Sequence, residues 1–120
     1  MRQIRFRAWD VGYKHWINRF SLDSDGSTLL YADIGYRVPK EAILVQFTGL
    51  LDKNGKEIYE GDILKHDLWG KTEVIWDNES ACFRGKNNEK KHDITLAHHQ
   101  LNRSRIIGNI YENLELLRNA

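Results

Sequence analysis

Three carboxylates near the middle of the sequence have the types and spacing of a possible catalytic or metal site. Glu57, Glu60 and Asp62 flank Gly61, so a turn at this glycine would bring them together. Such a group can act as a general acid and base or bind a divalent cation. Turn carboxylates more often accept hydrogen bonds from backbone N–H groups, and this segment supplies no nucleophile beside them. We therefore expect a structural role for all three.

The histidines are the next candidates for chemistry. The sequence has five of them, and His92, His98 and His99 lie near one another. A zinc site normally combines ligands at fixed short spacings with cysteine or acidic partners, and adjacent histidines on a strand point to opposite sides. We therefore expect no metal site. A metal-dependent hydrolase that uses His92 and His98 is the weakest alternative.

The remaining sequence signals for catalysis are also weak. Cys82 is the only cysteine, so no disulfide can form within the chain. Between Ala81 and Phe83 it has the surroundings of a small apolar filler, not of an activated thiol. A glycine-rich phosphate loop and a nucleophile elbow do not occur in the sequence. We expect no enzymatic activity, no catalytic residue and no cofactor.

Basic residues combined with an aromatic residue at a turn indicate a different kind of chemistry. Trp69 precedes Gly70 and Lys71, and an exposed aromatic ring beside a cation can stack on nucleobases. The opposing interpretation is that tryptophans pack in the cores of small β domains and that short basic clusters are solvated surface. The candidate surface for nucleic acid or another partner consists of Arg5, Arg7, Trp69, Lys71, Arg84 and Lys86.

Length and composition limit the classes of protein to consider. The chain has 120 residues, with 18 Lys+Arg against 17 Asp+Glu and 41% hydrophobic residues. These values are typical of one globular domain and exclude bulk disorder, a fibrous class and a strongly basic nucleic-acid-binding domain. No apolar run approaches the ~20 residues of a membrane-spanning helix. We expect a protein of the cytosol with no membrane partner and identify no small-molecule substrate.

The first part of the chain alternates short apolar segments with turn residues. Residues 4–9 alternate apolar and basic side chains, which predicts a strand with Ile4, Phe6 and Ala8 on its buried face. Residues 15–20 and 28–32 are expected as strands of a hairpin around the turn-rich segment 23–27.

The later part shows the same pattern more strongly. Asn54 and Gly55 predict a type I′ turn, because this turn requires positive φ at both central positions. Residues 92–102 fit a helix as well as a strand, and that choice stays open. Residues 112–118 predict a short C-terminal helix. Further strands are expected at residues 41–47, 57–59, 63–66, 71–76, 80–84 and 105–111.

Short strands with frequent turns predict an all-β fold with minor helix, either a small barrel or a sandwich. Three segments then indicate a family. Residues 46–64 (QFTGLLDKNGKEIYEGDIL), residues 4–10 (IRFRAWD) and residues 106–113 (IIGNIYEN) resemble, in this order, the motifs of the YopX family of phage and prophage proteins. The sequence departs from the family pattern at Leu114, where proline is usual.

The resemblance implies a β-rich fold with a small SH3-like β-barrel in its C-terminal part. We expect a single YopX-like domain, with N-terminal β-hairpins in residues 1–45 and a barrel-like part with a short C-terminal helix in residues 46–120. The family-motif residues expected to be structural are Thr48, Gly49, Asn54, Gly55, Tyr59, Gly61, Asp62, Gly108, Asn109 and Tyr111.

The family resemblance implies no established biochemical activity. We therefore expect a phage- or prophage-encoded, non-enzymatic module that binds an unknown protein or assembles with itself, located in the cytosol of the bacterial host. The alternative is a small β-barrel that binds single-stranded nucleic acid through the candidate surface.

Overall fold

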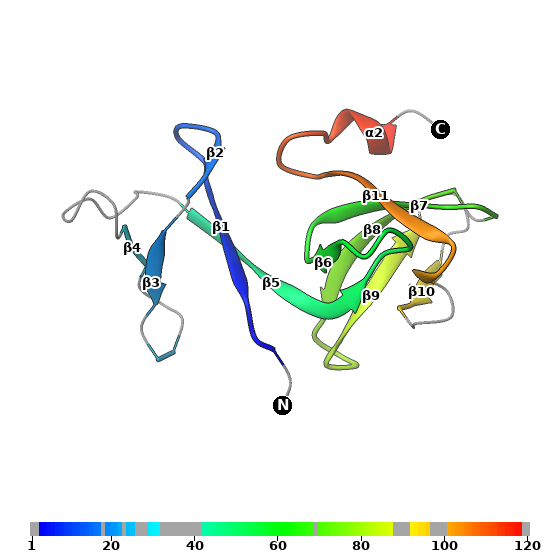
Figure 1. Cartoon of the computed structure of the whole chain (residues 1–120), viewed down its shortest axis with the longest axis horizontal. Helices are drawn as coiled ribbons and strands as arrows, with labels where there is room; N and C mark the ends of the chain where they lie inside the picture. Colours follow the sequence, from blue (N-terminus) through cyan, green and yellow to red (C-terminus); the bar gives the residue numbers. More distant parts are fainter. Residues whose placement is uncertain are drawn as a thin grey trace. The chain divides into compact units, whose positions relative to one another are not determined.

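The computed structural model describes residues 3–17, 19–22, 24–25, 29–31, 42–68, 70–87, 92–96 and 101–118. Their secondary structure is mainly β, with the short helix α2 (Glu115–Arg118) after the last strand (Figure 1). The mainly β prediction is therefore confirmed. The chain divides into two compact units, residues 6–45 and residues 1–5 together with 46–120. No helix among the described residues is long and apolar enough to span a membrane.

The unit of residues 6–45 contains two antiparallel hairpins, and the first of them belongs to a four-stranded sheet. Strands β1 (Phe6–Asp10) and β2 (His15–Trp16) pair with Trp9 opposite Trp16, and the two indole rings lie 5.0 Å apart. Strands β3 (Phe20–Leu22) and β4 (Leu29–Tyr31) pair antiparallel, as predicted for the hairpin around residues 23–27. The single strand predicted at residues 15–20 is wrong, because β2 ends at Trp16 and β3 begins at Phe20.

The predicted buried face of the first strand is only partly correct. Ala8 is fully buried, whereas Ile4 is 56% exposed and Phe6 is 36% exposed. Burial is concentrated at the other end of β1, where Trp9 packs on Trp16 and Asp10 accepts the backbone N–H of Tyr13. A period-two pattern gives the alternation of side chains but not the end of the strand that the core covers.

Strand β5 (Ala42–Leu51) passes from this unit into the other one and pairs there with β6 (Glu57–Tyr59). The turn between them is not type I′. The N–H of Gly55 donates to the carbonyl of Asp52, so Lys53 and Asn54 are the central residues, and Gly55 alone has positive φ, at 80°. A type I turn followed by a left-handed glycine is the usual three-residue hairpin loop.

The second unit is built around a curved five-stranded antiparallel sheet (Figure 1). Its strands are β7 (Asp62–His66), β8 (Gly70–Asp77), β9 (Cys82–Asn87), β10 (His92–Thr95) and β11 (Ser104–Asn109). Their order is β10-β9-β8-β7-β11, so four strands follow one another as hairpins and β11 returns to pair with β7. Residues 92–95 of the ambiguous segment are therefore a strand, and residues 97–100 lie outside the described part.

The main hydrophobic cluster of this unit lies on one face of the sheet, and Ile63 of β7 is fully buried on the other face, opposite Glu73. Ile58, Leu64, Val74 and Leu101 form the buried cluster, with Ile106 packed against it. Leu64 and Val74 belong to neighbouring strands, and Ile58 comes from β6. Each fully buried branched side chain contributes roughly 1.5–3 kcal/mol, so this cluster is a main source of stability for the unit.

Gly61 lies at the turn between β6 and β7 and has two structural constraints. Its φ is +89°, and a Cβ atom added there would lie 2.8 Å from Cε2 of Tyr111. Its N–H donates to the carbonyl of Val74, and its own carbonyl accepts the N–H of Ile110. Gly55 has a similar φ of +80°, but no atom lies within 4 Å of an added Cβ.

These two glycines provide a matched test of that close contact. Gly55→Ala carries only the cost of left-handed backbone, roughly 1–2 kcal/mol. We expect Gly61→Ala to cost about 1–3 kcal/mol more, because the new methyl group overlaps the Tyr111 ring. Chemical denaturation measures both. In a Tyr111→Ala background the two glycine substitutions should cost the same, and a persistent difference would contradict the assigned contact.

Candidate charged surface and aromatic pair

Cross-strand register places three of the predicted basic residues on one face of the five-stranded sheet. Lys71 and Glu73 alternate on β8, and residues paired across neighbouring strands share a face. Lys86 lies opposite Glu73, and Arg84 lies opposite Ile75. Lys71, Arg84 and Lys86 therefore project from the face opposite the core residues Leu64 and Val74. We call this the charged face.

The remaining predicted residues do not join this group. Arg5 lies beside β6, where its Nη1 is 2.7 Å from Oε2 of Glu57. Arg7 belongs to the other unit, and its guanidinium lies 3.9 Å from the centre of the Trp16 ring. Trp69 lies outside the described residues. The structure thus brings together Lys71, Arg84 and Lys86 of the predicted set.

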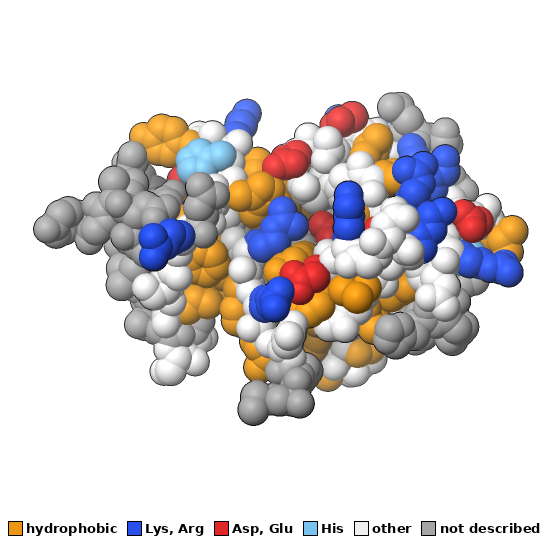
Figure 2. All heavy atoms as spheres, viewed as in Figure 1, with side chains coloured by type: hydrophobic (Ala, Val, Ile, Leu, Met, Phe, Trp, Pro, Cys, Tyr) orange, Lys and Arg blue, Asp and Glu red, His pale blue; other side chains and the backbone are white. Residues whose placement is uncertain are grey.

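Two further cations on the charged face were not among the predicted site residues. Arg105 of β11 lies opposite Lys65 of β7, and Lys65 lies opposite Lys71 of β8. We call Arg105, Lys65 and Lys71 the basic row. The pairing of Lys65 with Lys71 could have been predicted from the sequence, because the two lysines lie at equal distances from the turn of the β7–β8 hairpin. Figure 2 shows Lys and Arg side chains gathered over β7 and β11.

The three members of the basic row differ in their partners. The Nζ of Lys71 donates to the carbonyl of Leu116 at 2.8 Å, within the single turn of α2. The bond satisfies a carbonyl that has no partner within so short a helix. Lys65 and Arg105 are exposed and form no ion pair with any residue that the structure describes. Like charges directly opposite one another on a sheet are destabilising.

The three predicted carboxylates have different partners. Glu57 pairs with Arg5, and Asp62 accepts the backbone N–H of Tyr59 at 2.8 Å. Glu60 lies near Tyr111, and burial raises its pKa against the opposing effect of a hydrogen bond from the Gln46 backbone. Among the described residues, no three His, Cys, Asp or Glu side chains form a group that could hold a metal ion.

Tyr111 lies among several acidic residues next to the turn at Gly61. Burial, together with the charges of Glu60, Glu73 and Asp62, raises the pKa of Tyr111 to about 12. Burial also raises the pKa of Glu73, while the charge of Lys86 opposes this shift. The phenol is therefore a neutral group at physiological pH and is not poised as a base.

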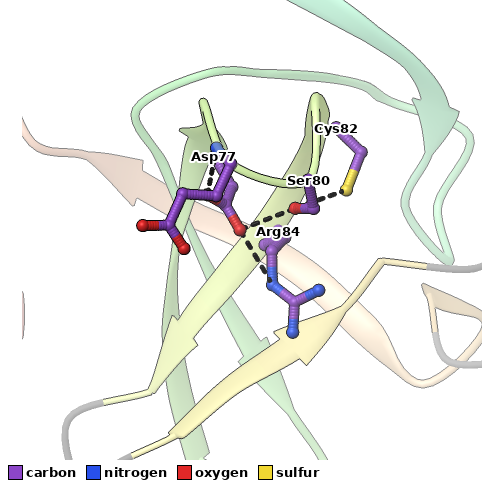
Figure 3. A network of polar contacts seen from close by, with 5 residues as sticks. Asp77, Ser80, Cys82 and Arg84 are labelled. Atoms are coloured by element: carbon purple, nitrogen blue, oxygen red, sulfur yellow. Dashed lines mark hydrogen bonds and ion pairs between the residues drawn. The ribbon is translucent and has the colours of Figure 1, made fainter.

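The hairpin between β8 and β9 is closed by a polar network (Figure 3). The hydroxyl of Ser80 donates to Oδ2 of Asp77 at 2.6 Å, and Nε of Arg84 lies 3.8 Å from the same oxygen. The Ser80 hydrogen bond is the main cause that lowers the pKa of Asp77. Cys82 is half-buried, with its Sγ 3.3 Å from Oγ of Ser80. All of these contacts lie within the β8–β9 hairpin and connect its turn to the adjoining ends of β8 and β9.

An aromatic pair lies next to this network, on the other face of the hairpin. Trp76 and Phe83 are cross-strand partners with ring centres 4.9 Å apart in an edge-to-face arrangement. Trp76 is nevertheless 43% exposed, so this ring lies at the surface of the hairpin although it packs against Phe83. Its Nε1 donates to Oδ1 of Asn78 at 2.9 Å, which fixes the direction of the indole ring.

Several polar contacts lie within the segments that carry the family motifs. The hydroxyl of Thr48 donates to the carbonyl of Ile58, and Gly49 follows with a φ of +86°. Oδ1 of Asn109 accepts the backbone N–H groups of Tyr111 and Glu112. A Cβ atom at Gly108 would lie 2.6 Å from Oδ1 of Asn113.

Asp52 forms the contact that joins the two motif segments. Its Oδ1 accepts the N–H groups of Asn54 and Lys56, and its Oδ2 accepts the N–H of Ile106 on β11 at 3.0 Å. The carboxylate is only 6% exposed. Burial alone raises its pKa, but the three hydrogen bonds and the charge of Lys56 outweigh that effect and lower it.

The comparisons with known proteins agree with this arrangement. A family model described as YopX protein matches residues 5–118. Protein EF1440 from Enterococcus faecalis is similar in fold, with a TM-score of 0.72 and 24% identity over 98% of this chain and 99% of that one. Protein yopX from Bacillus subtilis has a TM-score of 0.63 and 22% identity over 98% of this chain and 99% of that one. No curated protein matches the sequence.

The contacts of Asp52 predict how its removal changes the pH dependence of stability. A carboxyl group with a lowered folded-state pKa stabilises the protein above its unfolded pKa of about 3.9, and this contribution is lost as the pH falls. We expect Asp52→Asn to cost about 2–3 kcal/mol at pH 7, since charge-assisted hydrogen bonds are lost. Urea denaturation from pH 7 to pH 3 should show the difference from wild type shrinking below about pH 4. A constant difference would contradict this assignment.

Proposed function

Because the chain belongs to the YopX family, we propose that it is a phage- or prophage-encoded, non-enzymatic binding module that acts in the cytosol of the bacterial host. The observation that carries the proposal is the exposed aromatic pair of Trp76 and Phe83. Its partner is another protein, or a second copy of the same chain.

The geometry of the pair supports binding to a protein surface. Tryptophan is enriched among the residues that contribute most to protein interfaces. The edge contact with Phe83 and the hydrogen bond to Asn78 hold the indole in one orientation. Little side-chain entropy is then lost when a partner covers the ring, and this favours tight binding.

The strand arrangement supports two further parts of the proposal. We propose that the curved five-stranded sheet is the SH3-like barrel that the family resemblance implied, since four consecutive strands form a meander and β11 returns to β7. Strand β10 lies at one end of the strand order. An edge strand can pair with a strand of another molecule, so β10 supports self-assembly as one form of the interaction.

A second candidate function is binding of single-stranded nucleic acid. The observation that favours it is the gathering of basic residues on the charged face, where Lys65 lies opposite both Lys71 and Arg105. Salt-dependent affinity is the property that distinguishes this function from binding through the aromatic pair.

The aromatic pair predicts the effect of one substitution on partner binding. We expect affinity-tagged wild type to retain a partner from infected or induced cells, and Trp76→Ala to weaken that interaction about 30-fold, the equivalent of roughly 2 kcal/mol at a hot spot. Binding of the purified partner is measured by calorimetry. Leu68→Ala is the control, because Leu68 is 70% exposed on a different hairpin of the same unit. A monodisperse monomer that retains no partner would count against the proposal.

A further inference from the structure

We propose that the basic row formed by Arg105, Lys65 and Lys71 is a phosphate-binding site that holds the backbone of a single-stranded nucleic acid. This inference rests on the second candidate function and names the part of the charged face that makes the phosphate contacts.

The first argument is the unbalanced charge of the row. Three cations lie on adjacent strands in direct register, and strands in a sheet are about 4.8 Å apart, so the row spans about 10 Å. Each like-charge pair costs folding stability. A bound anion removes this repulsion, whereas the unliganded protein retains it.

The second argument is that nearby acids already have other partners. Asp67, which follows β7, has its Oδ1 3.9 Å from Nζ of Lys53. Glu73, two residues from Lys71 on β8, lies opposite Lys86, whose charge acts on its carboxyl group. Lys65 and Arg105 form no ion pair with a described residue. These two side chains are therefore available to an external anion.

The third argument concerns the form of the ligand. The row is a line of charges, and a nucleic-acid strand carries phosphates at regular intervals along one chain, whereas carboxylates on a folded acidic protein are irregularly placed. Arg105 offers a planar fork that can bind phosphate through two hydrogen bonds, and Lys65 adds a mobile point charge.

The other half of the charged face is less suited to the same ligand. Arg84 lies 3.8 Å from the carboxylate of Asp77, and Lys86 lies opposite Glu73. Its cations therefore alternate with acids that repel phosphate. The basic row and the Arg84–Lys86 pair lie on one face and thus provide a matched comparison.

The test is fluorescence anisotropy with a labelled oligothymidylate of about 20 nucleotides at ~50 and ~200 mM salt, over which phosphate contacts lose affinity. The row variant is Lys65→Gln with Arg105→Gln, and the control is Arg84→Gln with Lys86→Gln. Both remove two positive charges from the same face. Lys71 is left unchanged because it also bonds the carbonyl of Leu116.

We expect the row variant to bind at least 10-fold more weakly than wild type at the lower salt, and the control to change less than 3-fold. The slope of log affinity against log salt should fall by about 1.4 in the row variant, since each lost contact to a single strand contributes ~0.7. Thermal unfolding supplies a second readout. The row variant should unfold at the same or a higher temperature than wild type, because it loses like-charge repulsion.

Each other outcome overturns a defined part of the proposal. Equal losses in both variants would show that the whole charged face binds and that the row is not the site. Binding of polyglutamate as tightly as the oligonucleotide would overturn the nucleic-acid assignment. Wild type that binds no oligonucleotide at ~50 mM salt would remove both the site and the second candidate function, while leaving the protein-binding proposal at Trp76 intact.

Discussion

The buried carboxylate of Asp52 is the interaction on which the arrangement of the larger unit depends. One oxygen fixes the loop between β5 and β6, and the other bonds β11, which lies far along the chain. The backbone adds a parallel link, because the N–H of Lys53 donates to the carbonyl of Ser104. A hairpin loop therefore covers part of the outer edge of β11. An uncovered edge would be open to pairing with other chains.

The close packing around Gly61 provides a second attachment of the β11 region, in addition to the hydrogen bonds of Asp52. The turn at Gly61 accepts the N–H of Ile110 and packs against the ring of Tyr111, so the segment after β11 is held at the start of β7. From there the chain leads to α2, whose carbonyl at Leu116 meets Lys71 on β8. The family motifs thus have a physical meaning in this chain, because they bring together the first and the last strand of the sheet in chain order, β7 and β11.

Local sequence patterns predicted the class of fold well, because strands and turns are specified by neighbouring residues. The Asn54–Gly55 signal located a hairpin but gave the wrong turn type, since the hydrogen bonds of the Asp52 side chain favour Lys53 and Asn54 as the central positions. The ambiguity at residues 92–95 was resolved by pairing with β9, which a periodicity argument does not contain. Tertiary partners decide what local patterns leave open.

For the candidate site, too, the sequence indicated residue types, whereas strand pairing decided which residues lie together. The sequence marked Lys71, Arg84 and Lys86 as candidates, but their common face depends on the registers of β8 and β9. Arg105 joins Lys65 only because β11 returns to β7, and no local spacing expresses that pairing. The exposure of Trp76 likewise depends on which elements pack against β8, and the sequence pattern of the strand does not contain that information.

The return of β11 to β7 also determines the order in which the sheet can form. Strands β7 to β10 are joined by local hairpins, which form within microseconds in isolation. The β7–β11 ladder requires closure of the long loop that contains those hairpins, and contacts between distant segments are slow to form. We expect one edge of β7 to stay unpaired during folding until β11 pairs with it. The contacts of Asp52 and Gly61 with the β11 region are then the last to be made, so they secure a sheet whose other strands are already paired.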